Sequence, residues 1–509
     1  MFKSFCNYFF YFSSALILIS VFSCSSTDTA TGSYQSVKVY EKPLFSKIVK
    51  KSIAYEGVAK NPVIIVHGFL GSKLQNLETG KDVWGYISNY QLIRGYSDKQ
   101  YREMHHPMDY GVKLKDIKSN VKPVSMLNDF DVKIFFMKFS LNAYNGMINV
   151  LEHAGYVSEG VSNDRNKKYD NLFQYYYDWR RDNVENASNL HDFILEKRKY
   201  MQDKYAEVYG IKDFDVQFDI VAHSMGGLVA RYYLRYGNQD MPEGDLLPKL
   251  DWRGGKYIDK VIIVGTPNAG YLDTVIEMTD GLKINPKAPA YPPAVIGTFP
   301  SYYQMMPLLS TKSVVYEDDY EGKPVNLFDP DIWIKLKWGI VDPNQDDILK
   351  VLLPEVKSKK ERRKIAVDHL IKCLKRAKKF TDALKVVSTP EVGVTKFLYL
   401  GDAVKTSSRA TVNKTTGKLK VVEYDSGDGK VLASSAIMDN REGQKWSPFF
   451  SSPINWKEIY HLKAAHMGIT ECYTFADDIT YNLLITPTDK QRERIAYIKK
   501  AEQQTKKKR

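Results

Sequence analysis

The stretch Phe218 to Tyr232, FDIVAHSMGGLVARY, restricts the fold more than any other part of the chain. β-branched and aromatic residues lead to Ala222, and apolar residues at helical spacing follow Gly226. A strand, a sharp turn with a serine at its apex and a helix form the pattern of an activated serine. Its strained turn requires small residues two positions before and after that serine. Ala222 stands where glycine is usual, and it meets the same requirement as Gly226. The stretch therefore predicts that Ser224 is a nucleophile and not an ordinary turn residue.

A second motif lies upstream, where Val63 to Val66 form a short apolar run that is typical of a buried parallel strand. The sequence HGFLGS follows at once, beginning at His67. A His-Gly turn after the first core strand brings backbone N–H groups to an active site of this kind. Attack on an ester requires two donors aimed at the developing oxyanion. We assign them to the amides of Phe69 and Met225.

Strand and helix patterns alternate along the rest of the chain, which predicts a mostly parallel sheet. Further strands are expected at 172–176, 258–264 and 396–401, helices at 140–155 and 186–209, and a hairpin around 413–417. The predicted fold class is α/β: an α/β-hydrolase core, with a mostly parallel sheet flanked by helices, and helical cap and lid insertions.

A serine hydroxyl needs an imidazole to take its proton, and that imidazole needs an acid to orient it. In an α/β hydrolase the order along the chain is serine, acid, histidine. Asp428, in the turn Gly427-Asp428-Gly429, and His466, at the end of a strand-like run, meet this order. Asp425 and Asp402 compete as the acid. His461 competes as the base, although its place within the strand-like run favours a structural role.

The composition favours a membrane surface as a partner over nucleic acid. The chain has 509 residues, 43% of them hydrophobic, and a net charge of +13, which suits anionic partners. No zinc-ligand spacing, P-loop or aromatic-basic nucleic-acid motif is present, so we predict no metal, no cofactor and no nucleic acid. Residues 357–385 hold twelve Lys or Arg against three Asp or Glu, with apolar residues at helical spacing. That apolar stripe is expected to pack on the core, with a basic outer face that attracts anionic lipid.

The N-terminus has the form of an export signal. Residues 1–23 carry one charge, Lys3, and an apolar run that precedes Cys24. The sequence VFSC before Ser25 resembles a bacterial lipobox, so we predict lipidation of Cys24 and an exported, membrane-anchored lipoprotein of the cell envelope. A secreted protein is the alternative. Cys373 and Cys472 are then the cysteines left for one disulfide, which nothing in the sequence requires.

These patterns divide the chain into expected segments. Trp84 and Tyr86, with Tyr90 and Leu92, are candidates for an apolar lip over the site, an ordinary surface excursion being the other interpretation. The expected segments are a signal peptide at 1–23, a linker at 24–40, a first core part at 41–270 with a lid insertion at 75–135, a cap insertion at 271–390, a second core part at 391–489, and a basic tail at 490–509.

The chain resembles the lecithin:cholesterol acyltransferase family, which includes lysosomal phospholipase A and phospholipid:diacylglycerol acyltransferase. The resemblance rests on PVIIVHGFLGSKL, EHAGY, YDWR, AHSMGG, VGTPNAG, PSYYQMMP, LYLG, SGDG and AAHMGI, which run from about residue 61 to 485. YDWR ahead of AHSMG is the most distinctive of these. The resemblance implies that Ser224, Asp428 and His466 are nucleophile, acid and base, and that the amides of Phe69 and Met225 hold the oxyanion. Family members commonly close the lid with a disulfide, but residues 75–135 contain no cysteine.

The expected function is that of a serine-dependent O-acyltransferase or phospholipase. It would transfer a fatty acyl group from a glycerophospholipid to a lipid alcohol or to water. A carboxylesterase or thioesterase that acts on soluble esters is the alternative, and a non-catalytic surface lipoprotein is a third interpretation.

Overall fold

The structure is a computed structural model. It describes residues 46–87, 95–134, 137–142, 144–283, 290–388, 393–440, 451–486, 488–494 and 496. The predicted signal peptide, Cys24, Tyr90, Leu92 and the end of the basic tail lie outside the described residues. No helix in the described ranges combines the length and the apolar character needed to cross a bilayer.

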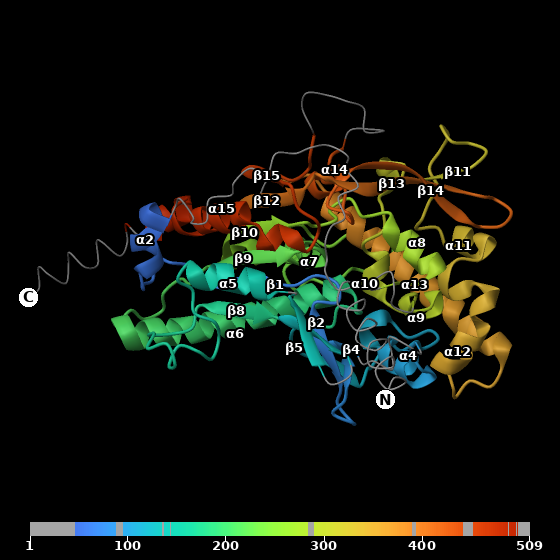
Figure 1. Ribbon diagram of the computed structural model, residues 1–509, viewed down its shortest axis with the longest axis horizontal. Helices are drawn as coiled ribbons and strands as arrows, with labels where there is room; N and C mark the ends of the chain where they lie inside the picture. Colours follow the sequence, from blue (N-terminus) through green and yellow to red (C-terminus); the bar gives the residue numbers. More distant parts are fainter. Residues whose placement is uncertain are drawn as a thin grey trace, which may run out of the picture. The chain divides into compact units, whose positions relative to one another are not determined.

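A six-stranded sheet forms the centre of residues 44–509, and all of its strand pairs are parallel (Figure 1). The strand order is β15-β12-β10-β9-β1-β8. The bounds of these strands are β1 Val63–Val66, β8 Leu172–Tyr175, β9 Phe218–His223, β10 Ile258–Val264, β12 Thr395–Gly401 and β15 Glu458–Leu462. The predicted mostly parallel sheet is confirmed, and strand β9 lies in its interior.

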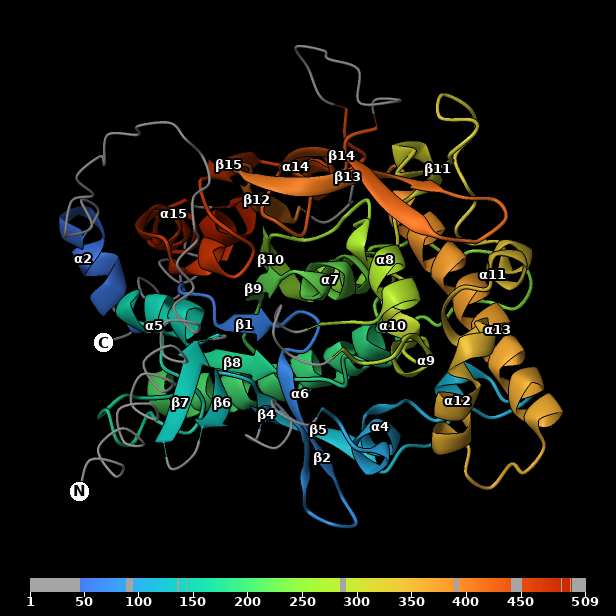
Figure 2. The same ribbon diagram turned by 45° about the vertical axis from the view of Figure 1, so that its right-hand side comes forward.

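Alternate residues of the strands face two separate apolar layers, as expected for a sheet that is covered on both faces. On one face Ile64, Ile220 and Ile263 pack with α6 (Asn183–Tyr209) and α7 (Met225–Tyr236). On the other face Ile65 and Val221 pack with α5 (Asn145–His153) and α15 (Tyr473–Leu484). Figure 2 shows α5 and α7 near the two ends of β1.

The helix expected at 140–155 begins later than predicted. Met137–Asn142 form strand β7, and α5 begins only at Asn145. The reason is visible in the sequence MKFSLN, in which apolar and polar residues alternate with the period of a strand. The helical pattern that follows masked this signal.

The expected lid insertion contains ordered structure that its irregular sequence did not predict. Its helix α4 has a capping box formed by Ser97 and Gln100, a local pattern that the sequence does contain. Its elements, together with their sheet partners, are β2 Ser72–Asn76, β3 Asp82–Trp84, β4 Tyr86–Ile87, α4 Asp98–Met104, η1 Leu114–Asp116, β5 Val121–Met126, β6 Asp129–Ile134 and β7 Met137–Asn142. They form two three-stranded sheets, β3-β2-β5 and β4-β6-β7.

The segment between β10 and β12 is mainly helical, and its longest helix is α13 (Lys359–Lys385). The predicted apolar stripe of α13 is buried: Phe380 stacks on Tyr232 of α7, and Arg376 bonds the N-cap carboxylate of α6, Asp182, at 2.6 Å. The other elements here are η2 Arg253–Tyr257, which precedes β10, α8 Asp273–Asp280, α9 Pro293–Ile296, α10 Pro300–Tyr303, η3 Leu309–Thr311, β11 Val314–Tyr316, α11 Pro330–Leu336, η4 Gly339–Val341, η5 Pro343–Gln345 and α12 Asp346–Leu352.

The predicted hairpin is β13 (Val404–Val412) with β14 (Leu419–Gly427), and β11 joins β13 in a third small sheet. The remaining elements are α2 Ser46–Ala54, α14 Ala433–Ile437 and η7 Gly468–Glu471. Cys373 and Cys472 are both free thiols, so the disulfide that the sequence allowed does not form.

The first residues of the expected basic tail are bound to the core. Lys490 donates to the carbonyl of Ile258 at 2.7 Å, and Arg494 pairs at 3.1 Å with Asp259, which is fully buried. Thr488 donates to the other oxygen of Asp259 at 2.6 Å. The sequence predicted only a basic tail here, because the buried carboxylate that these residues meet lies far away along the chain.

Candidate active site

Ser224 lies between β9 and α7 with φ 54° and ψ −128°, a backbone region that residues with a side chain rarely adopt. This turn places the hydroxyl at the carboxyl end of the sheet, where ligands of α/β proteins bind. The predicted strand, turn and helix are therefore present. A Cβ added to Gly226 would lie 2.3 Å from the carbonyl oxygen of His67, so the first turn of α7 requires glycine here.

The structure brings Ser224, His466 and Asp428 together from three loops. His466 Nε2 lies 2.9 Å from Ser224 Oγ, and His466 Nδ1 lies 2.7 Å from Asp428 Oδ2. The amide of His466 also donates to the carbonyl of Asp428 at 2.8 Å. An imidazole held in this way has Nδ1 protonated toward the carboxylate and Nε2 free to accept the serine proton.

Asp428 is almost fully buried, yet it remains ionised. Burial raises the pKa of its carboxyl group, but the charge of His466 and hydrogen bonds from His466, Val431 and Lys430 outweigh burial and lower that pKa below its usual value. Oδ1 accepts from the amides of Val431 at 2.7 Å and Lys430 at 2.9 Å. Oδ2 is left for the imidazole. Each carboxylate oxygen therefore has its own partners.

The competing candidates lie elsewhere. His461 Nδ1 and Asp402 Oδ2 are 2.8 Å apart and form a separate pair, in which both side chains are at least one third exposed. Asp425 lies on β14 and is exposed. Neither acid and neither nitrogen of His461 reaches Ser224. His461 belongs to β15, as its position in the sequence indicated.

The loop after β1 lies directly against the serine. A Cβ placed on Gly68 would be 2.7 Å from Ser224 Cβ. Within the described part of the chain, the amides of Phe69 and Met225 donate to no protein acceptor. Two such N–H groups beside one hydroxyl are available to an oxyanion.

The side chain of His67 packs within this loop and holds it by hydrogen bonds. Its ring is fully buried and stacks on Tyr177 with a centroid separation of 4.1 Å. His67 Nδ1 lies 2.7 Å from the carbonyl of Gly68, and Nε2 lies 3.2 Å from the amide of Tyr177. The carbonyl can only accept and the amide can only donate, so the proton of this imidazole resides on Nδ1.

The motif YDWR, residues 177–180, also forms hydrogen bonds with the end of this loop. Trp179 donates to the carbonyl of Ser72, and the fully buried guanidinium of Arg180 pairs with Asp178 at 2.8 Å. Arg180 also donates to the carbonyls of Met104 and His105 at 3.0 and 3.1 Å. The motif therefore joins the oxyanion loop to the insertion and contributes no reacting group.

Trp84 is bound to the loop after β1. It is 4% exposed and donates to the carbonyl of Leu70 at 2.8 Å. The apolar lip over the site stays a prediction for Trp84, whose indole N–H bonds a carbonyl of the loop after β1. Tyr86 lies in β4, and its side chain is outside the described residues.

Buried neutral histidines predict that the fold is sensitive to acid. Burial lowers the pKa of His67 and of His223 to about 3 and that of His369 to about 4, and burial also places the pKa of His106 well below its usual value. The unfolded chain takes up these protons near pH 6.5 and the folded chain does not. Stability is therefore complete above about pH 6.5 and falls as the pH decreases toward 4. His67, His223 and His369 each cost about 2 kcal/mol at pH 5, and His106 acts in the same direction.

Urea unfolding at pH 7.5, 6 and 5 measures this loss. Burial raises the pKa of Asp219 to about 7. The folded chain therefore takes up a proton there before the unfolded chain does, which stabilises the fold as the pH decreases and reduces the total loss of stability. A variant with the exposed His153 replaced by glutamine should show the same pH dependence as the parent. Equal unfolding free energies at pH 7.5 and 5 would contradict the prediction.

The sheet, the strained serine turn and the loops at its carboxyl end define an α/β hydrolase. The family model described as lecithin:cholesterol acyltransferase matches residues 130–426, more than half of the chain. The chain therefore belongs to the lecithin:cholesterol acyltransferase family. The matched region includes Ser224 and ends before Asp428 and His466.

One solved structure supports the fold, and others share weaker similarity with the chain. A chain of the Tle4–Tli4 complex is 13% identical with a TM-score of 0.51, covering 84% of this chain and 98% of that one. Lipase 1 from Pelosinus fermentans is 11% identical with a TM-score of 0.33, over 84% of this chain and 100% of that one. The mature lipase BlEst2 from Bacillus licheniformis is 11% identical with a TM-score of 0.31, over 85% and 95%. No curated protein matches the chain significantly.

Proposed function

We propose that the protein is a serine acyltransferase or phospholipase that removes a fatty acyl group from a glycerophospholipid. The observation that carries the proposal is the chain of contacts from Ser224 Oγ through His466 to Asp428, at 2.9 and 2.7 Å. Membership of the family supports a lipid acyl ester as the substrate class.

In the proposed reaction, Ser224 Oγ attacks the ester carbonyl while His466 Nε2 takes the hydroxyl proton. Asp428 stabilises the imidazolium that forms, and the amides of Phe69 and Met225 donate to the oxyanion. The tetrahedral intermediate then expels the lysophospholipid alkoxide, which receives its proton from His466. An acyl ester of Ser224 remains, and water or a lipid alcohol, deprotonated by His466, releases the acyl group.

Product analysis on one phospholipid tests this function. Vesicles of phosphatidylcholine are offered with and without a diacylglycerol or a sterol, and free fatty acid and acylated acceptor are measured. We expect release of fatty acid in both cases, with transfer to an acceptor if the enzyme is an acyltransferase. A fluorophosphonate probe is expected to label Ser224 in the folded protein. Absence of both labelling and product would refute the proposal, and equal rates on micellar and monomeric esters would favour the soluble-ester alternative.

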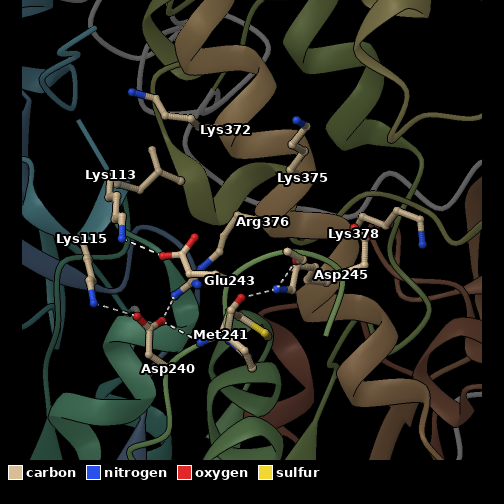
Figure 3. Close-up of a pocket in the computed structure, with 14 residues that line it drawn as sticks. Lys113, Lys115, Asp240, Met241, Glu243, Asp245, Lys372, Lys375, Arg376 and Lys378 are labelled. Atoms are coloured by element: carbon tan, nitrogen blue, oxygen red, sulfur yellow. Dashed lines mark hydrogen bonds and ion pairs between the residues drawn. The ribbon is translucent and has the colours of Figure 1, made fainter. Parts of the chain in front are cut away.

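We also propose that the protein works at an anionic membrane surface, attached through a lipidated Cys24. Support comes from the basic face of α13, which borders a groove of about 490 Å³ against the loop 240–245 (Figure 3). In this groove Lys113 forms an ion pair with Glu243, and Lys115 forms one with Asp240. Lys375 is exposed and makes no ion pair within the described ranges. Loss of lipid labelling in a Cys24→Ser variant would be the expected result for the anchor.

Reversing charge on α13 tests the surface. A variant with Lys375→Glu and Lys378→Glu should bind vesicles that contain phosphatidylglycerol at least about tenfold more weakly, since each basic side chain near such a surface is worth about 1 kcal/mol. Hydrolysis of a monomeric short-chain ester should be unchanged. The matched control replaces both lysines by arginine and should bind as the parent does. Equal binding of the glutamate variant in low salt would rule out this face.

A further inference from the structure

A buried path of hydrogen bonds connects the two loops of the site. The hydroxyl of Tyr144, just before α5, accepts from the amide of Gly68 at 2.7 Å and lies 3.1 Å from Nδ1 of His223. His223 is the last residue of β9, and its Nε2 lies 3.2 Å from the carbonyl oxygen of His466. Both side chains are at most 4% exposed. The path therefore runs from the oxyanion loop to the backbone of the proposed base.

The chemistry of the groups sets the direction of every bond in this path. The carbonyl of His466 can only accept, so Nε2 of His223 carries the proton. Nδ1 of His223 then accepts from the hydroxyl of Tyr144, whose oxygen is left to accept from the N–H of Gly68. His223 remains neutral in this role, because burial and then the nearby charge of His466 lower its pKa to about 3. One arrangement of protons satisfies the whole path.

The two loops need such a link because the sheet does not join them directly. The oxyanion loop follows β1, which neighbours β9, whereas the loop of His466 follows β15 at the sheet edge, three strands away from β9. Irregular loops gain little rigidity from a sheet, and displacements of about 1 Å cost large factors in rate. His223 contacts the His466 loop through a hydrogen bond and a ring separation of 4.9 Å.

We propose that Tyr144 and His223 are positioning residues that hold the oxyanion loop and His466 in register with Ser224. The inference rests on the proposed function and deepens it. Neither residue reaches the reacting atoms. Their effect is expected on the transition state, where both the oxyanion donors and the base must be in place together.

Tyr144→Phe is the direct test, because it removes one oxygen and keeps the ring. The amide of Gly68 then loses its acceptor and Nδ1 of His223 loses its donor. On phosphatidylcholine vesicles we expect kcat to fall about 10- to 100-fold with KM changed less than about twofold, the pattern of an interaction needed only in the transition state. The matched control is Tyr156→Phe, a buried tyrosine of the same apolar layer whose hydroxyl makes no hydrogen bond within the described residues. Its kcat should equal that of the parent.

His223→Gln provides the second variant, since its amide can still donate to the carbonyl of His466 but no longer accepts from Tyr144 in the same place. The double variant should lose less than the sum of the two single losses, because both substitutions break one path. A folded Tyr144→Phe protein with kcat within twofold of the parent, or additive losses, would overturn the inference. Ser224→Ala is measured alongside: if it retains activity the proposed function fails, whereas if Ser224 is essential and Tyr144→Phe is unimpaired, only the positioning role fails.

Discussion

Replacing Asp428 by asparagine is expected to lower kcat about 10⁴-fold while leaving the protein folded. Asparagine keeps an oxygen where Oδ1 accepts from the amides of Lys430 and Val431. Its NH₂ group then occupies the place of Oδ2 and donates toward Nδ1 of His466. That nitrogen must now accept, so the proton moves to Nε2 and faces Ser224. The imidazole in this tautomer cannot take the serine proton, and triads changed in this way lose about 10⁴ in kcat.

Initial rates on phospholipid vesicles, with near-ultraviolet circular dichroism as the measure of folding, test this expectation. Asp402→Asn is the control, because Asp402 pairs with the exposed His461 and should be dispensable for turnover. Ser224→Ala should reach a residual rate as low as or lower than that of Asp428→Asn. A folded Asp428→Asn enzyme with more than about a tenth of the parental kcat would show that another group orients His466.

The second large effect is expected for Gly68→Ala. The added methyl group would lie 2.7 Å from Cβ of Ser224 and 3.1 Å from the carbonyl oxygen of His223, both parts of the serine turn. The loop must therefore retreat, and the amide of Phe69 moves with it. Loss of one oxyanion donor costs about 10²- to 10³-fold in kcat.

The control for this substitution is Gly393→Ala, where an added Cβ meets no atom of the described residues within 4 Å. Both variants are compared by kcat and by the rate of fluorophosphonate labelling. We expect both quantities to fall for Gly68→Ala and neither for Gly393→Ala. If Gly68→Ala turns over at the parental rate, the donor does not lie in the loop after β1.

The sequence was most informative where function imposes a local pattern. The turn around Ser224 is encoded within a few residues, and so is the choice of His466 over His461, because one follows a strand and the other belongs to it. The YDWR motif was visible, but its role was not. Burial of Arg180 against Asp178 depends on an insertion some 75 residues earlier in the chain. Periodicity within a segment carries no information about such partners.

The same limit applies to single residues. Trp84 is apolar in an irregular segment, which suggested a lip over the site, and its bond to the carbonyl of Leu70 could not be predicted from that pattern. Tyr144 has no pattern that distinguishes it from other tyrosines, and its importance becomes visible only when Gly68 and His223 are brought beside it. Both residues form hydrogen bonds with backbone groups of distant loops. Since every residue carries such groups, a local sequence pattern does not show which of them a side chain will meet.

The bond between Arg494 and Asp259 has a consequence for how the polypeptide matures. Asp259 lies inside the sheet near the middle of the chain, and its cationic partner is synthesised 235 residues later. Until the end of the chain has been made, Asp259 has the amide of Asn61 and the nearby charge of Lys260 as partners but lacks its ion pair with Arg494, and a buried charge with incomplete pairing is costly. We therefore expect the native state to be less stable until the stretch from Thr488 to Arg494 has been released from the ribosome.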